Sequence, residues 1–339
     1  MSVPKSNMRY VRLGKSGLKV SKIILGTMQY GSTDWASWVL PEEEAIKHIK
    51  FADQAAGLPR EELVIMTKVY FATPYEPAQS LFRKGLTPGD VGIINQHGLN
   101  RKHIFDSVKA SLKRLQLDYV DVLQCHRFDY ETPIEETMRA LDDLVKAGYV
   151  RYLGMSSCHA YQYAECVPIL SLMPNLSLWL TPRANAAYAL AHNLTPFISM
   201  QNHYNLAYRE EERDMFPTLA QLGVGAIPWS PLARGLLTRP AAAAAQTTRG
   251  QGDWYMPYKK STTDVITKVE ELSKRKGVSM AQIAVAWMLS KPGVTAPIVG
   301  TTSLANLEDI LGGLDVQLTE EEIKELEAPY RPQPIMGHD

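Results

Sequence analysis

A lysine and a histidine lie near the ends of two consecutive predicted strands, where they could act together on a carbonyl group. Lys68 belongs to the apolar run Leu63–Val69, and His126 ends the run Tyr119–His126. The charge of a lysine lowers the pKa of a neighbouring phenol, and a histidine can orient a carbonyl oxygen. Such groups are suited to protonating an aldehyde or ketone while a hydride arrives from a nicotinamide. Taken alone, each residue is more often structural, Lys68 as a solvated strand-end lysine and His126 as a buried histidine.

The elements that must position these residues alternate between strands and helices. Short apolar runs predict seven strands, and segments between them carry apolar residues at helical spacing. The predicted strands are Lys22–Met28, Leu63–Val69, Tyr119–His126, Tyr152–Ser157, Phe197–Gln201, Val224–Ser230 and Ala296–Gly300. This alternation implies right-handed crossovers and a parallel sheet. A glycine-containing turn between Tyr10–Leu13 and Leu18–Val20 predicts a β-hairpin before them.

The choice between the two large parallel folds depends on the residues after the first strand. No GxGxxG follows it, so the dinucleotide-binding fingerprint of the doubly wound fold is absent. We therefore expect an α/β fold of the (β/α)8 TIM-barrel type, whose active site gathers residues from the carboxyl ends of the strands. Polar residues stand at those ends: Lys68, His126, Ser156, Ser157, Gln201 and Ser230.

Capping signals mark the starts of several helices. Asn100 and Ser279 each precede a segment with helical periodicity and are expected to cap it. Thr132, with Glu135 three residues later, predicts a capping box.

Two stretches depart from a regular barrel. Only seven residues, 56–62, separate the predicted helix Glu42–Ala55 from the strand Leu63–Val69, whereas a strand-plus-helix unit needs roughly 30. We therefore expect an incomplete barrel of seven core strands that lacks the second βα unit. Residues Glu165–Asn193 show no clear period and predict an atypical insertion. Residues 1–339 otherwise form one predicted barrel domain.

Composition excludes several classes of protein. The 36 basic and 36 acidic side chains balance without a basic run, which argues against a nucleic-acid surface. The most apolar run, Val167–Leu180, is short and contains two prolines, so no membrane span is expected. The N-terminus lacks a signal peptide and the three cysteines form no CxxC pair, which predicts a cytoplasmic protein. The histidines lack ligand spacing, so no metal is expected. The oligomeric state stays open.

Seven blocks of the sequence together resemble a known family. They are VRLGKSGLKVSKIILGTM, VIMTKV, YVDVLQCHRFD, GYVRYLGMSS, SMQNHYNL, IPWSPLARGLL and APIVGTTSLANLEDI. In this order they resemble the aldo-keto reductase superfamily, and within it a fungal branch with versiconal hemiacetal acetate reductases and aryl-alcohol-dehydrogenase-like enzymes. The resemblance covers roughly nine-tenths of the chain. It implies a (β/α)8 barrel that reduces aldehydes and ketones with NADPH.

The resemblance also implies roles for individual residues. Lys68 and His126 match the family's catalytic lysine and histidine. Ten residues match positions that bind the cofactor: Ser156, Ser157 and Gln201 for the nicotinamide carboxamide, Trp229, Ser230, Leu232 and Gly235 along the nicotinamide and pyrophosphate, and Gly300, Thr302 and Asn306 for the adenosine phosphate. Asn306 stands where many relatives carry arginine.

The family's catalytic aspartate and tyrosine have no counterpart in this sequence. Relatives carry them in a D-x-A-x-x-Y motif within the unit that is missing here. The nearby candidates for these two roles are Tyr30, Asp34 and Tyr70. Tyr70 comes two residues after Lys68 on the same predicted strand and could face the same way. Two hypotheses follow. One is an NADPH-dependent reductase of a small carbonyl compound in fungal secondary metabolism. The other is an NADPH-binding barrel without turnover, as a sensor, a partner subunit or a defective isoform.

Overall fold

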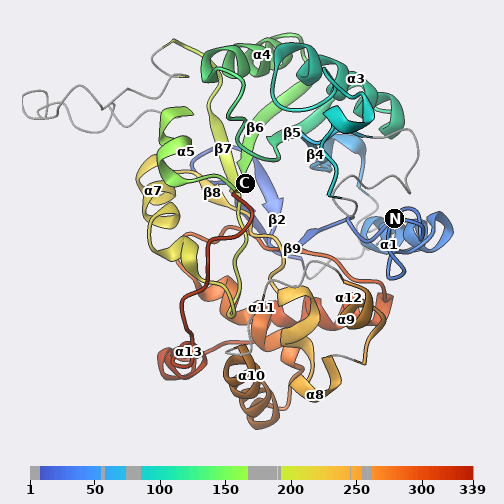
Figure 1. Ribbon diagram of the computed structural model, residues 1–339. Coiled ribbons are helices and arrows are strands. Elements are labelled where there is room, and N and C mark those ends of the chain that lie inside the picture. Colours follow the sequence, from blue (N-terminus) through green and yellow to red (C-terminus); the bar gives the residue numbers. More distant parts are fainter. Residues whose placement is uncertain are drawn as a thin grey trace, which may run out of the picture.

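A parallel sheet surrounded by helices forms the centre of the molecule (Figure 1). The computed structural model describes residues 8–54, 58–73, 85–166, 189, 192–244, 246–253, 258 and 262–338. Five strands pair in parallel in chain order: β4 (Met66–Val69), β5 (Val120–Cys125), β6 (Val150–Ser156), β7 (Phe197–Gln201) and β8 (Gly225–Ala226). The predicted α/β fold with a parallel sheet is confirmed.

Backbone hydrogen bonds extend this sheet by two more strands. β9 (Ile298–Val299) pairs in parallel with β3 (Ile24–Leu25). The N–H groups of Thr295 and Ile298 each donate, at 2.8 Å, to carbonyl oxygens of Ala226 and Pro228. All seven predicted strand positions therefore form strands, in the spatial order β4-β5-β6-β7-β8-β9-β3.

The two ends of this order are β3 and β4, and no hydrogen bond among the described residues joins them. Their side chains nevertheless share one apolar cluster, in which Ile24 and Met66 pack around Leu13 and Val20. The sheet therefore curves back on itself but is not seen to close. We call this place the β3–β4 gap; it lies where the sequence lacks a βα unit, and a closed (β/α)8 barrel stays a prediction.

Leu13 and Val20 belong to the predicted N-terminal hairpin, which is confirmed. Its strands are β1 (Tyr10–Arg12) and β2 (Lys19–Ser21), paired antiparallel. The turn between them packs against the start of β8, where the N–H of Lys15 donates to the carbonyl of Gly223 at 2.7 Å. The hairpin thus supports the amino ends of the strands, opposite the ends at which the predicted site residues stand.

Helices cover the outside of the sheet (Figure 1). The described α-helices are α1 (Glu42–Gln54), α3 (Arg101–Leu115), α4 (Ile134–Lys146), α5 (Ala160–Cys166), α7 (Met215–Leu222), α8 (Ala241–Ala244), α9 (Thr248–Gly252), α10 (Thr262–Lys276), α11 (Met280–Ser290), α12 (Leu304–Leu311) and α13 (Glu320–Glu327). Short 3-10 turns are η1 (Arg60–Glu62), η2 (Gly89–Val91), η4 (Glu210–Glu212), η5 (Ala233–Thr238) and η6 (Gly312–Leu314). Among these helices, none has the length and apolarity that crossing a membrane requires.

Apolar periodicity explains which faces are buried. Met138, Leu141 and Leu144 recur on one face of α4, and all three are fully buried in the main core. β5 is buried at every residue because both of its faces are covered. α11 is apolar on almost all sides, and it packs against α10, α12 and η6.

The helix caps confirm two predictions and correct a third. The side chains of Asn100 and Ser279 accept hydrogen bonds from the N–H groups of His103 and Gln282, as expected. The capping box at Thr132 is wrong, because α4 begins after Pro133, which makes no side-chain cap. The Thr132 hydroxyl instead donates to the Asp129 carboxylate at 2.7 Å, a charged acceptor that competes with the helix end. The predicted insertion Glu165–Asn193 falls largely outside the described residues, at 167–188 and 190–191.

We expect the hairpin turn to tolerate no side chain at Gly14. Gly14 has φ +60°, and an added Cβ would lie 2.5 Å from the carbonyl oxygen of Gly223. Gly14→Ala should lower the free energy of unfolding by at least about 1–3 kcal/mol, measured by urea denaturation. Gly17→Ala is the matched control, because nothing lies within 4 Å of its added Cβ. Equal effects of the two substitutions would contradict this packing.

Candidate active site

A chain of polar side chains crosses four strands at their carboxyl ends. Lys68 of β4 pairs in register with Gln124 of β5. The Gln124 side-chain oxygen accepts a hydrogen bond of 3.0 Å from the Gln201 side-chain amide. The Ser156 hydroxyl donates to the main-chain carbonyl of Gln201 at 2.7 Å. Gln124, Ser156 and Gln201 are buried. These hydrogen bonds satisfy their buried polar groups and hold them beside Lys68.

His126 follows β5 directly and lies next to Lys68. Its backbone N–H donates to the carbonyl of Val69 at 2.9 Å, which continues the β4–β5 pairing past the strand. Its ring contacts the edge of Phe71, with ring centres 4.9 Å apart. The two strand-end residues that the sequence singled out are therefore neighbours.

Burial and charge alter the protonation of both groups. Burial, helped by the positive charge of Arg127, lowers the pKa of Lys68 to about 8. Burial, together with the charges of Lys68 and Arg127, holds the pKa of His126 well below its usual range. At neutral pH the site therefore contains an ammonium and a neutral imidazole.

An aromatic stack forms the next part of the site. The Trp229 indole N–H donates to the Ser157 hydroxyl at 3.3 Å, and the His203 ring stacks on Trp229 with ring centres 4.1 Å apart. His203 also stacks on Tyr208, with ring centres 4.3 Å apart, and its Nε2 lies 2.8 Å from the Tyr258 hydroxyl. Burial first, and then nearby cations, lower the pKa of His203 to about 3, so this ring is neutral where it stacks on Trp229.

Unusual backbone conformations gather at the same place. Of six non-glycine residues with positive φ in the described chain, four belong here: Ser157, Ser230, Ala233 and Arg234. Side-chain-bearing residues adopt this region rarely, and such strain concentrates at ligand sites. Gly235, with φ +98°, completes a left-handed turn that begins after Leu232 and has open space beside its α-carbon.

A buried ion pair fastens this turn. The Arg234 guanidinium binds the Asp253 carboxylate through two hydrogen bonds, of 2.6 and 2.7 Å, and Arg249 adds a third of 3.0 Å. The Asp253 side chain has no exposed surface. Although burial would raise its pKa, the two arginines lower it below the ordinary value. The turn after β8 is therefore tied to α9.

Gly300, Thr302 and Asn306 lie one strand beyond Trp229. They follow β9, whose Ile298 bridges to Trp229. Asn306 lies in the first turn of α12, where its N–H donates to the Ser303 side chain. All three residues are exposed. The structure thus brings Lys68, His126, Ser156, Ser157, Gln201, Trp229 and Ser230 into one group, and places these three residues further along the same edge.

Among the described residues, the Lys68 ammonium makes no side-chain hydrogen bond or ion pair with a phenol or carboxylate. Asp34 is exposed, and its carboxylate accepts a hydrogen bond from Ser32. The Tyr30 ring packs against His48, with ring centres 5.6 Å apart, and Tyr70 packs against His97, with ring centres 4.8 Å apart. In the described part of the chain, none of these three candidates forms a hydrogen bond or ion pair with the lysine.

The C-terminal segment reaches this site from α13 (Figure 1). Met336 donates its N–H to the Tyr208 hydroxyl at 3.1 Å. A Cβ built on Gly337 would lie 3.6 Å from the Trp229 ring and 3.8 Å from the Ser157 hydroxyl. Sequence reasoning missed this contact, as it missed Arg127, His203 and Asp253. Arg127 and His203 were nonetheless visible inside the QCHRFD and SMQNHYNL blocks.

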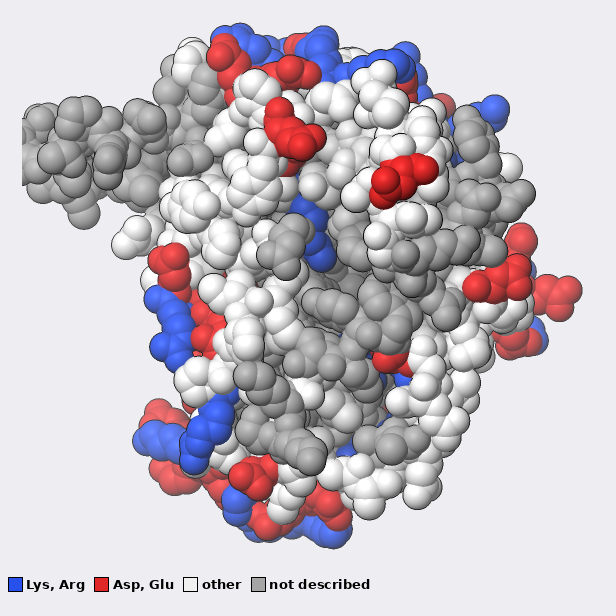
Figure 2. Space-filling model, viewed as in Figure 1, with Lys and Arg blue, Asp and Glu red and all other residues white. Residues whose placement is uncertain are grey.

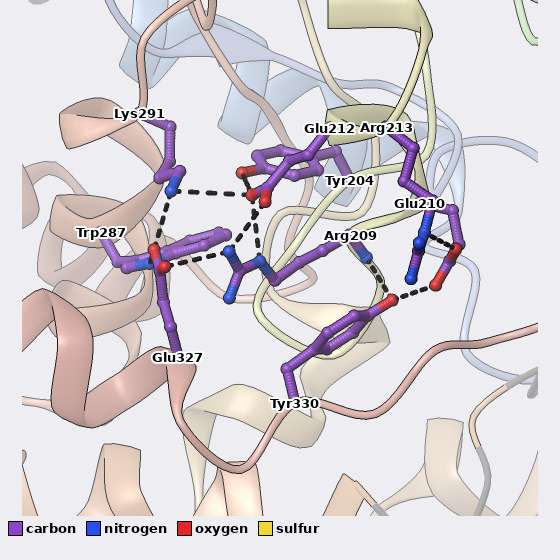
Figure 3. A network of polar contacts seen from close by, with 9 residues as sticks. All are labelled: Tyr204, Arg209, Glu210, Glu212, Arg213, Trp287, Lys291, Glu327 and Tyr330. Carbon is purple, nitrogen blue, oxygen red and sulfur yellow. Dashed lines mark hydrogen bonds and ion pairs between the residues drawn. The ribbon is translucent and has the colours of Figure 1, made fainter.

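A network of ion pairs holds the base of that segment (Figure 3). Arg209 binds Glu212 at 2.7 Å and Glu327 at 2.9 Å. Lys291 and the Trp287 indole each approach Glu327 to 2.8 Å. The Arg209 N–H donates to the Tyr330 hydroxyl at 3.0 Å. Because these groups come from η4, α11 and α13, the network fastens the path of the C-terminal segment toward Trp229.

Many of the charged side chains on the face seen in Figure 2 lie at its rim, over α1, α3, α4, α10 and α13. No group of three metal-ligating side chains occurs in the part of the chain that the structure describes.

The comparison with protein families decides the relationship. Residues 52–331 match the model of the aldo/keto reductase family. The chain belongs to this family. The chain is 41% identical, over 363 residues, to the putative aryl-alcohol dehydrogenase C977.14c of Schizosaccharomyces pombe, covering 97% of each chain. It is 40% identical to versiconal hemiacetal acetate reductase of Aspergillus parasiticus, over 362 residues and 97% and 98% of the two chains. The resemblance read from the seven blocks is confirmed.

These alignments also contain positions that have no residue in this chain. The alignment with the aldo-keto reductase AMT2 of Alternaria alternata, at 37% identity, spans 372 residues and exceeds the 339 residues of this chain by 33. At least that many aligned positions therefore have no residue in this chain. This agrees with a chain shortened by about one βα unit, which comprises roughly 30 residues.

We expect Asp253→Asn to destabilise the protein strongly. The substitution removes the carboxylate that Arg234 and Arg249 share, and breaking a buried pair from one side costs about 3–5 kcal/mol. Asp315→Asn is the control, because that aspartate pairs with Arg9 at the surface, where both side chains are more than half exposed. Thermal and urea unfolding of both variants would measure the difference. Similar stability of the two variants would contradict a fastening role for Asp253.

Proposed function

We propose that this protein reduces an aldehyde or ketone to an alcohol with NADPH, on a single (β/α)8-type barrel domain in the cytoplasm. The observation that supports it best is the placement of Lys68 and His126 side by side, at the end of the polar chain through Gln124, Gln201 and Ser156. A cation and a neutral imidazole hydrogen-bond donor can together stabilise negative charge on a carbonyl oxygen.

The residues present fit a nicotinamide cofactor. Left-handed backbone at Ser157 and Ser230 and the open turn at Gly235 provide a cradle of the kind that close ligand approach needs. Gln201, Ser156 and Ser157 would hold the carboxamide, and Trp229 would flank the ring. Gly300, Thr302 and Asn306 would hold the adenosine phosphate at the start of α12. When bound, the cofactor supplies the hydride.

The substrate class follows from the relatives. One similar protein is named an aryl-alcohol dehydrogenase and another a reductase of versiconal hemiacetal acetate. Trp229 and Phe71 are aromatic side chains on or next to the strand ends of the site. We therefore favour an aromatic carbonyl compound, such as a polyketide intermediate of fungal secondary metabolism.

A second candidate function is NADPH binding without turnover, as a sensor or partner subunit. The observation that favours it is the Lys68 ammonium, which has no phenol or carboxylate partner among the described residues.

Turnover and cofactor binding can be separated with matched variants. The purified protein should oxidise NADPH in the presence of aromatic aldehydes. Lys68→Met should lower kcat by about 10²-fold while the fluorescence titration with NADPH stays unchanged. Gln201→Ala should instead weaken NADPH binding, because it removes the amide that joins β5 to β7. Lys102→Met, at an exposed lysine of α3, is the control and should match the wild type.

Each other outcome selects an alternative. NADPH binding without carbonyl-dependent oxidation across a broad aldehyde and ketone panel would support the second function. Undetectable NADPH binding would contradict both.

We also expect Asn306 to limit the preference for NADPH over NADH. Asn306→Arg should raise this preference about tenfold, because a charge-assisted hydrogen bond to the 2′-phosphate contributes about 1.5–3 kcal/mol. The Kd values for NADPH and NADH, measured by fluorescence titration, would test this. Asn306→Gln, which adds length without charge, should leave the ratio unchanged. A ratio that is the same in all three proteins would place the phosphate elsewhere.

A further inference from the structure

Reduction of a carbonyl group requires a proton as well as a hydride, and the described site lacks the usual kind of donor. Lys68 and His126 are adjacent, but within the described structure neither Tyr30 nor Tyr70 forms a hydrogen bond with the Lys68 ammonium, and their rings pack against His48 and His97. The unit that would bring an aspartate and a tyrosine is the one missing at the β3–β4 gap. Among the described residues, Lys68 and His126 are therefore the groups from which we seek the proton.

We propose that the Lys68 ammonium itself donates the proton to the carbonyl oxygen, while the neutral His126 only donates a hydrogen bond. This rests on the proposed reductase function. Lys68 on β4 is in register with Gln124 on β5, and His126 comes two residues after Gln124, where its N–H continues the β4–β5 pairing. Because side chains two residues apart on a strand share a face, Lys68 and His126 lie on the same side of the sheet at adjacent strand ends.

The surroundings of Lys68 make its ammonium an acid of suitable strength. Arg127 follows His126 in the chain. Its guanidinium donates a hydrogen bond to the main-chain carbonyl of His126 at 2.7 Å. The same guanidinium lies 5.6 Å from the Phe71 ring centre. Of the residues that the structure describes, Arg127 is the charged group that acts on Lys68, and Lys68 in turn acts on the titratable His126; both Arg127 and His126 belong to the segment after β5. Burial and this neighbouring cation lower the pKa of Lys68 to about 8. A general acid works best when its pKa lies near the working pH.

The step balances without a further reactant. An N–H bond of the Lys68 ammonium breaks, and the proton bonds to the carbonyl oxygen as the supplied hydride bonds to the carbonyl carbon. The products are the alcohol, the oxidised nicotinamide and a neutral Lys68 amine. The amine regains a proton from water before the next turnover.

The pH dependence tests this assignment, with Arg127 variants as a matched pair. Because the acid must be protonated, kcat/KM for reduction should be level below a pH of about 8 and fall above it. Arg127→Gln removes the cation, raises the pKa of Lys68 and should move this fall to higher pH. Arg127→Lys keeps the charge and should leave the fall in place. A profile that is the same in all three proteins would overturn the proposal.

A readout independent of activity follows the amine itself. In protein labelled with ¹⁵N-lysine, with the Lys68 signal identified by its loss in Lys68→Arg, the titration midpoint should lie near 8 and rise in Arg127→Gln. A midpoint near the ordinary lysine value in the wild type would contradict the proposal.

Substitutions at the lysine and at the two tyrosines separate the possible donors. Lys68→Arg keeps a positive charge but does not release a proton, so it should lose turnover about as fully as Lys68→Met. Tyr30→Phe and Tyr70→Phe should retain turnover. An active Lys68→Arg, or an inactive tyrosine variant that still binds NADPH, would overturn the assignment but leave the reductase function intact. A wild-type protein without any turnover would contradict the reductase function itself.

Discussion

The hydrogen bonds between β4 and β5 align Lys68 with Gln124, and the rest of the site is built from that register. From Gln124 the contacts continue to Gln201 and Ser156 across the next two strands. Side chains on a strand alternate between its two faces, so a shift of β4 by one residue would turn Lys68 away from the others. The lysine is therefore positioned by main-chain pairing, since no side-chain partner among the described residues holds it.

The β3–β4 gap links the architecture of the molecule to its chemistry. Both strands that border it rest on the hairpin residues Leu13 and Val20, which gives this region an apolar support despite the missing hydrogen bonds. Unpaired strand edges are costly to leave uncovered. If the proposed reductase function holds, the same missing unit would carry the aspartate and tyrosine that the resemblance implies, so one shortening of the chain would affect strand pairing and proton supply together.

The C-terminal segment illustrates what local sequence patterns miss. Helix starts at Asn100 and Ser279 could be predicted because their hydrogen bonds join residues three apart. The Thr132 cap failed because Asp129 competes for the hydroxyl, a choice that depends on three-dimensional geometry. The approach of Gly337 to Trp229 joins residues 108 positions apart, and it depends on the ion-pair network around Arg209. No periodic pattern encodes such a contact.

The sequence by itself determined the seven strand positions, the family, and the two residues at consecutive strand ends, because apolar runs and short motifs are local properties of a chain. Only the tertiary structure decided which side chains meet. It placed His203 on Trp229, paired Arg234 with Asp253, and set Lys68 beside Arg127 with no carboxylate partner among the described residues. These outcomes depend on distances between segments that are remote in the chain, and on the burial that sets the charge of each group.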